Sequence, residues 1–227
     1  MKKSIVLMLT LLLFVWIGNP GNVVVRDQLT LDSAEINHLK IDTISASVKV
    51  TTADVDNIKI GLTGNIRINE GDPNAEFFLE ANRQGKTVTV QPQLKNGKVN
   101  SYSGAMEITV VMPTNLETLT VTTVSGDIDV LDFMGELYLE SVSGNIYVKN
   151  INQIPNALNA ESVSGRIEAL LPNKAGFHLS VSTVSGRLHI GFPVTVSGNK
   201  FSGPVNRGGS TQVKLNTVSD SIVVTGI

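Results

Sequence analysis

The sequence predicts an all-β protein, a single-stranded parallel β-helix (β-solenoid) with an irregular N-terminal β cap. An eight-residue unit recurs along the second half of the chain, as in solenoid proteins. Each copy alternates apolar and polar residues, which is the pattern of a half-buried strand. Hydrophobic residues make up 41% of the 227 residues and aromatic residues only 5%, so valine, isoleucine and leucine must fill the core.

The repeated unit reads Thr/Ser-Val-Ser-Gly-x-Ile/Leu. The first four copies begin 18, 21 and 21 residues apart, and the fifth begins 34 residues after the fourth. About 20 residues form one coil of a parallel β-helix and are too few for a propeller blade. The copies are Thr123–Val130, Ser141–Val148, Ser162–Ala169, Thr183–Ile190 and the degenerate Thr217–Val224, with a weaker relative at Thr43–Val50.

Stacked copies would bury one face of each strand, which a single repeat cannot do alone. The alternation predicts two inward columns, with the hydroxyl residues pointing outward and bonding to the backbone of neighbouring coils. The repeated glycine predicts a bulge or corner. We expect right-handed winding, because the coil lengths vary. The predicted inward columns are Val124, Val142, Val163, Val184 and Val218, and Ile128, Ile146, Ile167, Leu188 and Ile222.

The chain divides into three parts by pattern. Residues 1–22 are a signal peptide or membrane anchor, 23–112 an N-terminal β portion of the solenoid, and 113–227 the repeat solenoid. Candidate strands in the second part are Ile36–Val50, Ile58–Ile68, Phe77–Ala81, Thr87–Val90 and Met106–Met112. Asn96-Gly97 predicts a hairpin turn. Gly191–Gly209 predicts a loop inserted before the last coil, and we expect either this loop or a partner to cover the open end of the stack.

The N-terminus has the pattern of an export signal. Lys2 and Lys3 precede an apolar run from Ile5 to Ile17. A helix of that length spans about 20 Å, short of the roughly 30 Å hydrocarbon core, which favours a signal peptide. No small-residue cleavage site follows Ile17, which favours a retained anchor. Both alternatives place the rest of the chain outside the cytoplasm.

The repeat and the signal-like segment together resemble a bacterial family of putative adhesins that includes LiaG-like envelope proteins. The resemblance covers roughly residues 30–227 and is strongest from Val110 onward. It implies a β-solenoid on the outer side of a bacterial membrane, linked in some members to envelope-stress operons, and it implies no catalytic residue. The fifth copy departs from the pattern, because Asp220 replaces glycine, and this puts the bend of the last coil in question.

The composition indicates a binding protein more than an enzyme. The net charge of −2 and the lack of a basic patch argue against a nucleic-acid partner, and the absence of cysteine removes thiol chemistry and disulfides. We find no catalytic, cofactor or metal motif. We expect Arg166 and Arg187 to be neighbours on one outer face, with Glu168 and Asp127 beside them, and this is a candidate face for an anionic ligand.

The sequence therefore favours a non-enzymatic extracytoplasmic envelope protein, either an adhesin or a structural binding module. The expected partners are a cell-wall polymer, a glycan or an envelope protein, with the membrane reached through the N-terminal segment if it is not cleaved. A membrane-anchored regulatory protein of the envelope-stress response is the first alternative. A polysaccharide-active β-helix enzyme is the second, and it would need a carboxylate or calcium cluster beside a basic residue.

Overall fold

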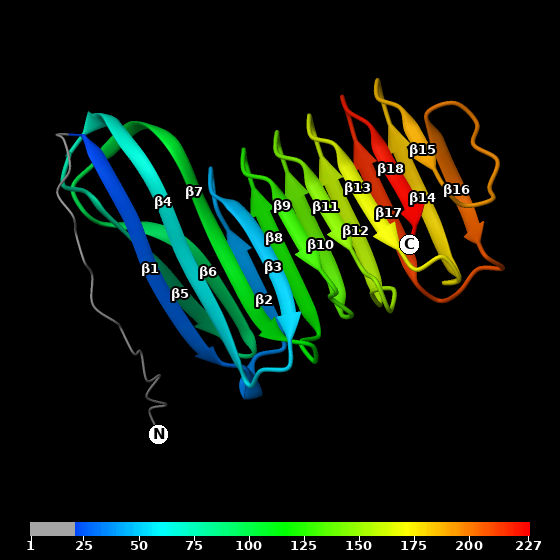
Figure 1. The fold of residues 1–227 in the computed structure, drawn as a ribbon, viewed down its shortest axis with the longest axis horizontal. Helices are drawn as coiled ribbons and strands as arrows, with labels where there is room; N and C mark the ends of the chain where they lie inside the picture. The colour runs from blue at the N-terminus through cyan, green and yellow to red at the C-terminus, as the bar shows by residue number, and fades with distance from the viewer. Residues whose placement is uncertain (1–20) are drawn as a thin grey trace.

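The computed structural model describes residues 21–227, so the predicted signal or anchor segment lies outside the described residues except for its last two. Two nine-stranded sheets enclose one continuous apolar core, with the strands stacked along the length of the molecule (Figure 1). Within the described residues the only helical element is the single 3-10 turn η1 (Ser33–Glu35). The all-β prediction is confirmed, and the central strands of both sheets are parallel.

Neighbouring strands within each sheet often lie far apart in the chain. In spatial order, sheet A consists of β1 (Asn22–Asp32), β4 (Asn57–Gly71), β7 (Val99–Pro113), β3 (Ser47–Ala53), β9 (Ile128–Leu131), β11 (Ile146–Lys149), β13 (Ile167–Leu171), β18 (Ile222–Gly226) and β15 (Leu188–Ile190). Sheet B consists of β16 (Lys200–Val205), β14 (Phe177–Thr183), β17 (Gln212–Thr217), β12 (Ala157–Ser162), β10 (Glu136–Ser141), β8 (Thr118–Thr123), β2 (His38–Asp42), β6 (Thr87–Asn96) and β5 (Glu76–Gln84).

The repeats alternate between the two sheets along the chain. Each Val-Ser-Gly corner carries the chain from a strand of sheet B to a strand of sheet A, as from β8 to β9. Thr43–Val50 forms the same corner between β2 and β3, and Val48 lies in register with Ile128. The weak relative of the repeat is therefore a coil of the stack.

The N-terminal end is built from long antiparallel strands. β4 pairs antiparallel with β1 and β7, and β5 pairs antiparallel with β6. The predicted Asn96-Gly97 hairpin is wrong, because β6 lies in sheet B and β7 in sheet A, and the turn at Gly97 (φ 77°) leads from one sheet to the other. The tight hairpin turn follows β5 instead, where Gly85 has φ 62°.

The fifth copy lies between the third and the fourth, which the sequence did not predict. β18 pairs with β13 on one side and β15 on the other, and β17 pairs with β12 and β14. The physical reason is β16, which lies inside Gly191–Gly209 and pairs antiparallel with the outer edge of β14. The segment predicted as a covering loop thus covers the edge of sheet B, but as a strand, while β15 is the end strand of sheet A, and the fifth copy lies on the other side of β14. Ile222 stays in register with Ile167 although Asp220 replaces glycine.

The faces of the corners differ from the prediction. The isoleucine column is inward as expected, but the five corner valines are exposed and the first hydroxyl of each copy is buried. The alternation stops at the hydroxyl, where the sheet B strand ends and the chain bends. The buried hydroxyls are Thr123, Ser141, Ser162, Thr183 and Thr217.

The corner explains both the buried hydroxyl and the glycine. The backbone N–H of Gly165 donates to Ser162 Oγ at 2.8 Å, and the same bond recurs in the first, second and fourth copies. A Cβ on Gly165 would lie 1.9 Å from the carbonyl oxygen of Gly144 in the next coil. In these four copies glycine, which has no Cβ, permits this close approach, whereas the fifth coil accommodates Asp220 at the same place.

Candidate functional site

An exposed row of aliphatic side chains runs along the corner from sheet B to sheet A. Surface hydrophobic residues are ordinary when scattered, but here one recurs in each of six successive coils. At about 4.8 Å per coil the row is roughly 24 Å long. In spatial order its members are Ile44, Val124, Val142, Val163, Val218 and Val184, and we call it the aliphatic row.

The backbone fixes the spacing of the aliphatic row. The N–H of Ser143 donates to the carbonyl of Val124 at 2.9 Å, and that of Ser164 donates to the carbonyl of Val142 at 2.8 Å. The Ser143 hydroxyl donates to the same Val124 carbonyl at 3.1 Å. Because each corner is bonded to the next, the valines are held at one per coil although their side chains are partly exposed.

A shallow groove of about 550 Å³ follows the row on its sheet B side. Valines form one wall, and the floor is the outermost column of sheet B, whose residues lie in register. The floor residues are Thr122, Glu140, Glu161, Asn216 and Ser182. We call this the valine groove.

Two carboxylates stand side by side in the floor of the valine groove. Glu161 accepts from Lys214 Nζ at 3.0 Å and from Asn216 Nδ2 at 3.3 Å. The bond from Lys214 lowers the pKa of the Glu161 carboxyl. Glu140, its neighbour in register, has no ion-pair partner within residues 21–227. The floor therefore holds two adjacent carboxyl groups and, among the described residues, only one of them has a cation beside it.

A second apolar cleft, of about 430 Å³, adjoins the N-terminal end of the row. Ile44 lines it together with Phe77 and Leu94. Phe77 packs edge-on against Tyr102, with ring centroids 6.0 Å apart, and the Tyr102 hydroxyl is hydrogen-bonded to the Ser45 hydroxyl. The aliphatic row thus begins beside an aromatic cleft.

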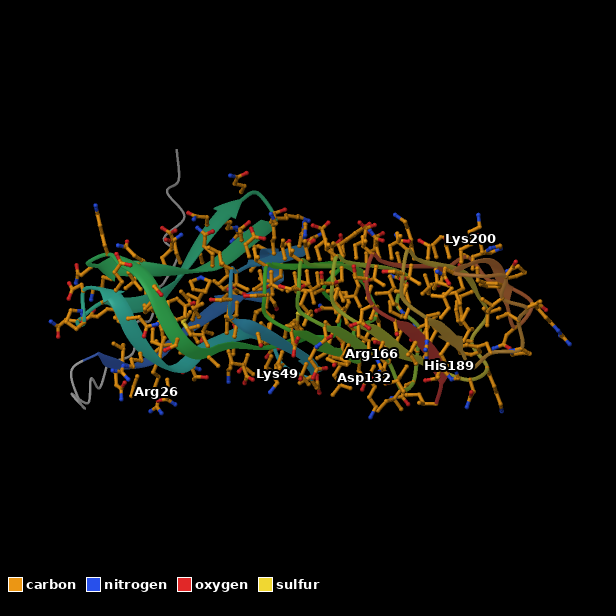
Figure 2. The ribbon with its side chains drawn as sticks, turned by 90° about the horizontal axis from the view of Figure 1, so that it is seen from above. Arg26, Lys49, Asp132, Arg166, His189 and Lys200 are labelled. Atoms are coloured by element: carbon orange, nitrogen blue, oxygen red, sulfur yellow. The ribbon has the colours of Figure 1, made fainter. Side chains whose placement is uncertain are left out.

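The residues proposed for an anionic ligand lie on the outer face of sheet A. Figure 2 shows Arg166 on the same long face as Lys49 and His189, with Lys200 on the opposite face. The expected contact between Arg166 and Arg187 is wrong, because the inserted last coil places Ser221 between them.

Both acidic residues of the proposed anion site, Glu168 and Asp127, have partners within the chain. Arg166 Nη2 is 2.9 Å from Glu168 Oε2, and Asp127 Oδ1 accepts from the backbone N–H and the side chain of Asn145 at 2.8 and 3.1 Å. The Asn145 side chain in turn accepts from the Arg166 backbone N–H at 3.0 Å. The contacts made by Asn145 join adjacent coils, so the face has a structural use, and anion binding there stays a prediction.

The described part of the chain has neither a metal-binding cluster nor a membrane-spanning helix. Residues 21–227 contain no cluster of three or more metal-ligating side chains, and none of their helices is long and apolar enough to span a membrane. The aliphatic row itself was missed from the sequence, since strict alternation placed the valines inside. The signal that could have found it is the Ser-Gly that follows the valine in four of the five copies, which is turn chemistry and ends the strand.

Comparison with known proteins identifies relatives of this fold. A family model described as Toastrack DUF4097 matches residues 21–225, which confirms the resemblance predicted from the repeats. A putative cell adhesion protein from Clostridium sporogenes superposes with a TM-score of 0.64 at 12% identity, covering 90% of this chain and 100% of that one. At this identity the likeness concerns the fold alone.

Two other solved structures are more distant. A putative adhesin from Bacteroides fragilis aligns with a TM-score of 0.40 at 13% identity, covering 88% of this chain and 96% of that one. A putative lipid binding protein from Parabacteroides distasonis aligns with a TM-score of 0.29 at 13% identity, covering 89% and 95%. No curated protein matches the chain.

Proposed function

The chain belongs to the Toastrack DUF4097 family, and on that premise we propose that it is a non-enzymatic, extracytoplasmic binding module of the bacterial envelope. Its binding surface is the aliphatic row, and its role is adhesive or structural. The partner is an envelope component, either a protein, a glycan or a wall polymer.

The observation that carries this proposal is the exposure of the row. Val124, Val142, Val163 and Val218 are each 44–47% exposed although they sit on corners joined to one another by backbone hydrogen bonds. Surface valines scattered singly are ordinary, whereas apolar side chains gathered in one continuous row are typical of an interaction surface. A rigid row also needs little ordering on binding, which favours affinity.

The location outside the cytoplasm rests on the sequence of the N-terminus. Lys2, Lys3 and the apolar run Ile5–Ile17 are the export signal, and the lack of cysteine is compatible with export. A retained segment would tether the module to the membrane and suit the regulatory alternative.

The non-enzymatic assignment rests on the use of the candidate charges. Asp127 is engaged by Asn145 of the adjacent coil and Glu168 by Arg166 of its own coil, so neither is free to act as a general acid or base. We also propose that the stack is a single-stranded, right-handed β-helix. The alternation of successive strands between two sheets supports a single winding path.

The experiment follows the full chain in the bacterium that encodes it. Cells are fractionated, the N-terminus is read by mass spectrometry, and isolated envelopes are sedimented with the purified chain or its V142S/V163S/V218S variant. The proposal predicts an extracytoplasmic chain that sediments with envelopes and a variant that does so at least about tenfold less. A cytoplasmic chain, or equal sedimentation of both proteins, contradicts it.

A further inference from the structure

We propose that the valine groove binds one α-helix of a partner protein, apolar once per turn and basic beside the apolar stripe. This rests on the proposed function and names the chemistry of its partner. The groove offers one apolar wall and one acidic floor, so its occupant must be amphipathic along its length.

The spacing of the wall selects a helix. Four valines, Val142, Val163, Val218 and Val184, line the groove, and at about 4.8 Å per coil their three intervals span about 14.4 Å. Three turns of an α-helix rise about 16.2 Å, so one apolar residue per turn stays near one valine throughout. Residues on one face of an extended strand recur every 6.6–6.8 Å, so each successive residue would be displaced by about 2 Å more from the valine opposite it.

The charge of the floor selects basic residues. Glu140 lies beside Glu161, and two adjacent carboxylates repel unless a cation stands between them. Lys214 neutralises Glu161 from within the chain, whereas Glu140 has no ion-pair partner in the described residues. A lysine or arginine next to the apolar stripe of the helix would reach Glu140, and Thr122 and Asn216 offer further polar groups.

The same charge disfavours a membrane surface as the occupant. Anionic headgroups would be repelled by Glu140, which has no ion-pair partner within the described residues, and a single row of valines offers a bilayer only a narrow apolar strip. A helix lying along the groove contacts both the wall and the floor, and such helix-in-groove docking is a common recognition mode.

The probe is an 18-residue peptide of leucine and lysine with helical periodicity, labelled with fluorescein. The control peptide has the same composition in strict alternation, which forms an amphipathic strand. Fluorescence anisotropy is measured with the full chain, purified in the form in which cells accumulate it. We expect the helical peptide to bind at least about tenfold more tightly than the alternating one.

Two variants provide matched controls. Val163 in the groove and Val24 in β1 are 47% and 48% exposed, so V163S and V24S remove the same apolar surface at different places. We expect V163S to weaken binding of the helical peptide about fivefold to tenfold and V24S to leave it unchanged. We expect E140K to weaken it at least as much as V163S. Urea unfolding of all three variants verifies that they are folded.

Several results would overturn the inference. These are equal binding of the two peptides, equal effects of V163S and V24S, or no binding of the helical peptide at micromolar concentrations. Sedimentation velocity showing a dimer that V163S dissolves would make a second copy the occupant. Binding to neutral or anionic vesicles that V163S abolishes would make it a membrane. Loss of envelope binding by V142S/V163S/V218S without peptide binding would refute the helix and leave the proposed function standing.

Discussion

Removing the buried hydroxyl of one corner should destabilise the whole stack. The Gly165 N–H donates to Ser162 Oγ at 2.8 Å, and both groups are buried. In Ser162→Ala this N–H loses its acceptor, and water cannot replace it because the next coil packs directly on the glycine. An unsatisfied buried donor costs about 1–3 kcal/mol.

The assay is equilibrium unfolding in urea followed by circular dichroism at a strand wavelength. With a slope of roughly 3 kcal/mol per molar urea, the midpoint should fall by about 0.3–1 M. Ser162→Thr retains a hydroxyl, as Thr123, Thr183 and Thr217 do at the same place in other copies, and should stay near the unmodified protein.

The matched control lies two residues away. Ser164 is exposed and its hydroxyl makes no hydrogen bond within the described residues, so Ser164→Ala should change the free energy of unfolding by less than about 0.5 kcal/mol. A Ser162→Ala protein as stable as Ser164→Ala would refute the buried-corner reasoning, since the two hydroxyls would then be equivalent.

Three further predictions concern stacking, the core and pH. Gly165→Ala should lower the free energy of unfolding by more than about 4 kcal/mol or prevent soluble production, because its Cβ would meet the Gly144 carbonyl at 1.9 Å. The control Gly61→Ala, whose Cβ would have nothing within 4 Å, should change the free energy of unfolding by less than about 1 kcal/mol. Equal effects of the two substitutions in urea unfolding would count against the close stacking. Ile167→Ala should cost about 2–5 kcal/mol in the same assay and Val163→Ala less than about 1 kcal/mol, and the reverse order would place the valine inside. Desolvation and nearby Lys40 hold the pKa of His38 below its ordinary 6.5, so the unfolded chain binds a proton on His38 more readily than the folded chain, and stability should decline as the pH falls below 6.5. In His38→Gln, which can retain the hydrogen bond to Thr120, the urea midpoint should decline less steeply with falling pH. An unchanged slope would exclude His38 as the cause.

The sequence predicted the stack well where the pattern was regular within a strand. The isoleucine column from Ile128 to Ile222 is inward, and the coil at Thr43–Val50 was recognisable, because both depend on alternation inside one strand or on the repeated corner. Alternation failed at the corner itself. It holds only while the backbone stays extended, and Thr123 ends β8 before Ile128 begins β9.

The order of the coils could not be predicted for a different reason. Chain order and spatial order agree only when each coil is added to a free edge. β16 covers the edge of β14, and the last coil lies on the other side of β14. Nothing in the composition of Gly191–Gly209 distinguishes a loop from an antiparallel edge strand, and the separation of Arg166 from Arg187 follows from that placement. The aliphatic row was missed for the same reason as the corner, so the candidate site was less predictable than the fold.

The most direct test of the account is cysteine labelling in intact cells, which is possible because the chain has no cysteine of its own. Val163→Cys and Ile167→Cys are produced in excess over any partner and treated with a membrane-impermeant maleimide before and after denaturation. We expect Val163→Cys to be labelled on intact cells and Ile167→Cys only after denaturation. A Val163→Cys chain that is labelled only after lysis would contradict the extracytoplasmic location. One that is labelled only after unfolding would contradict the exposed aliphatic row.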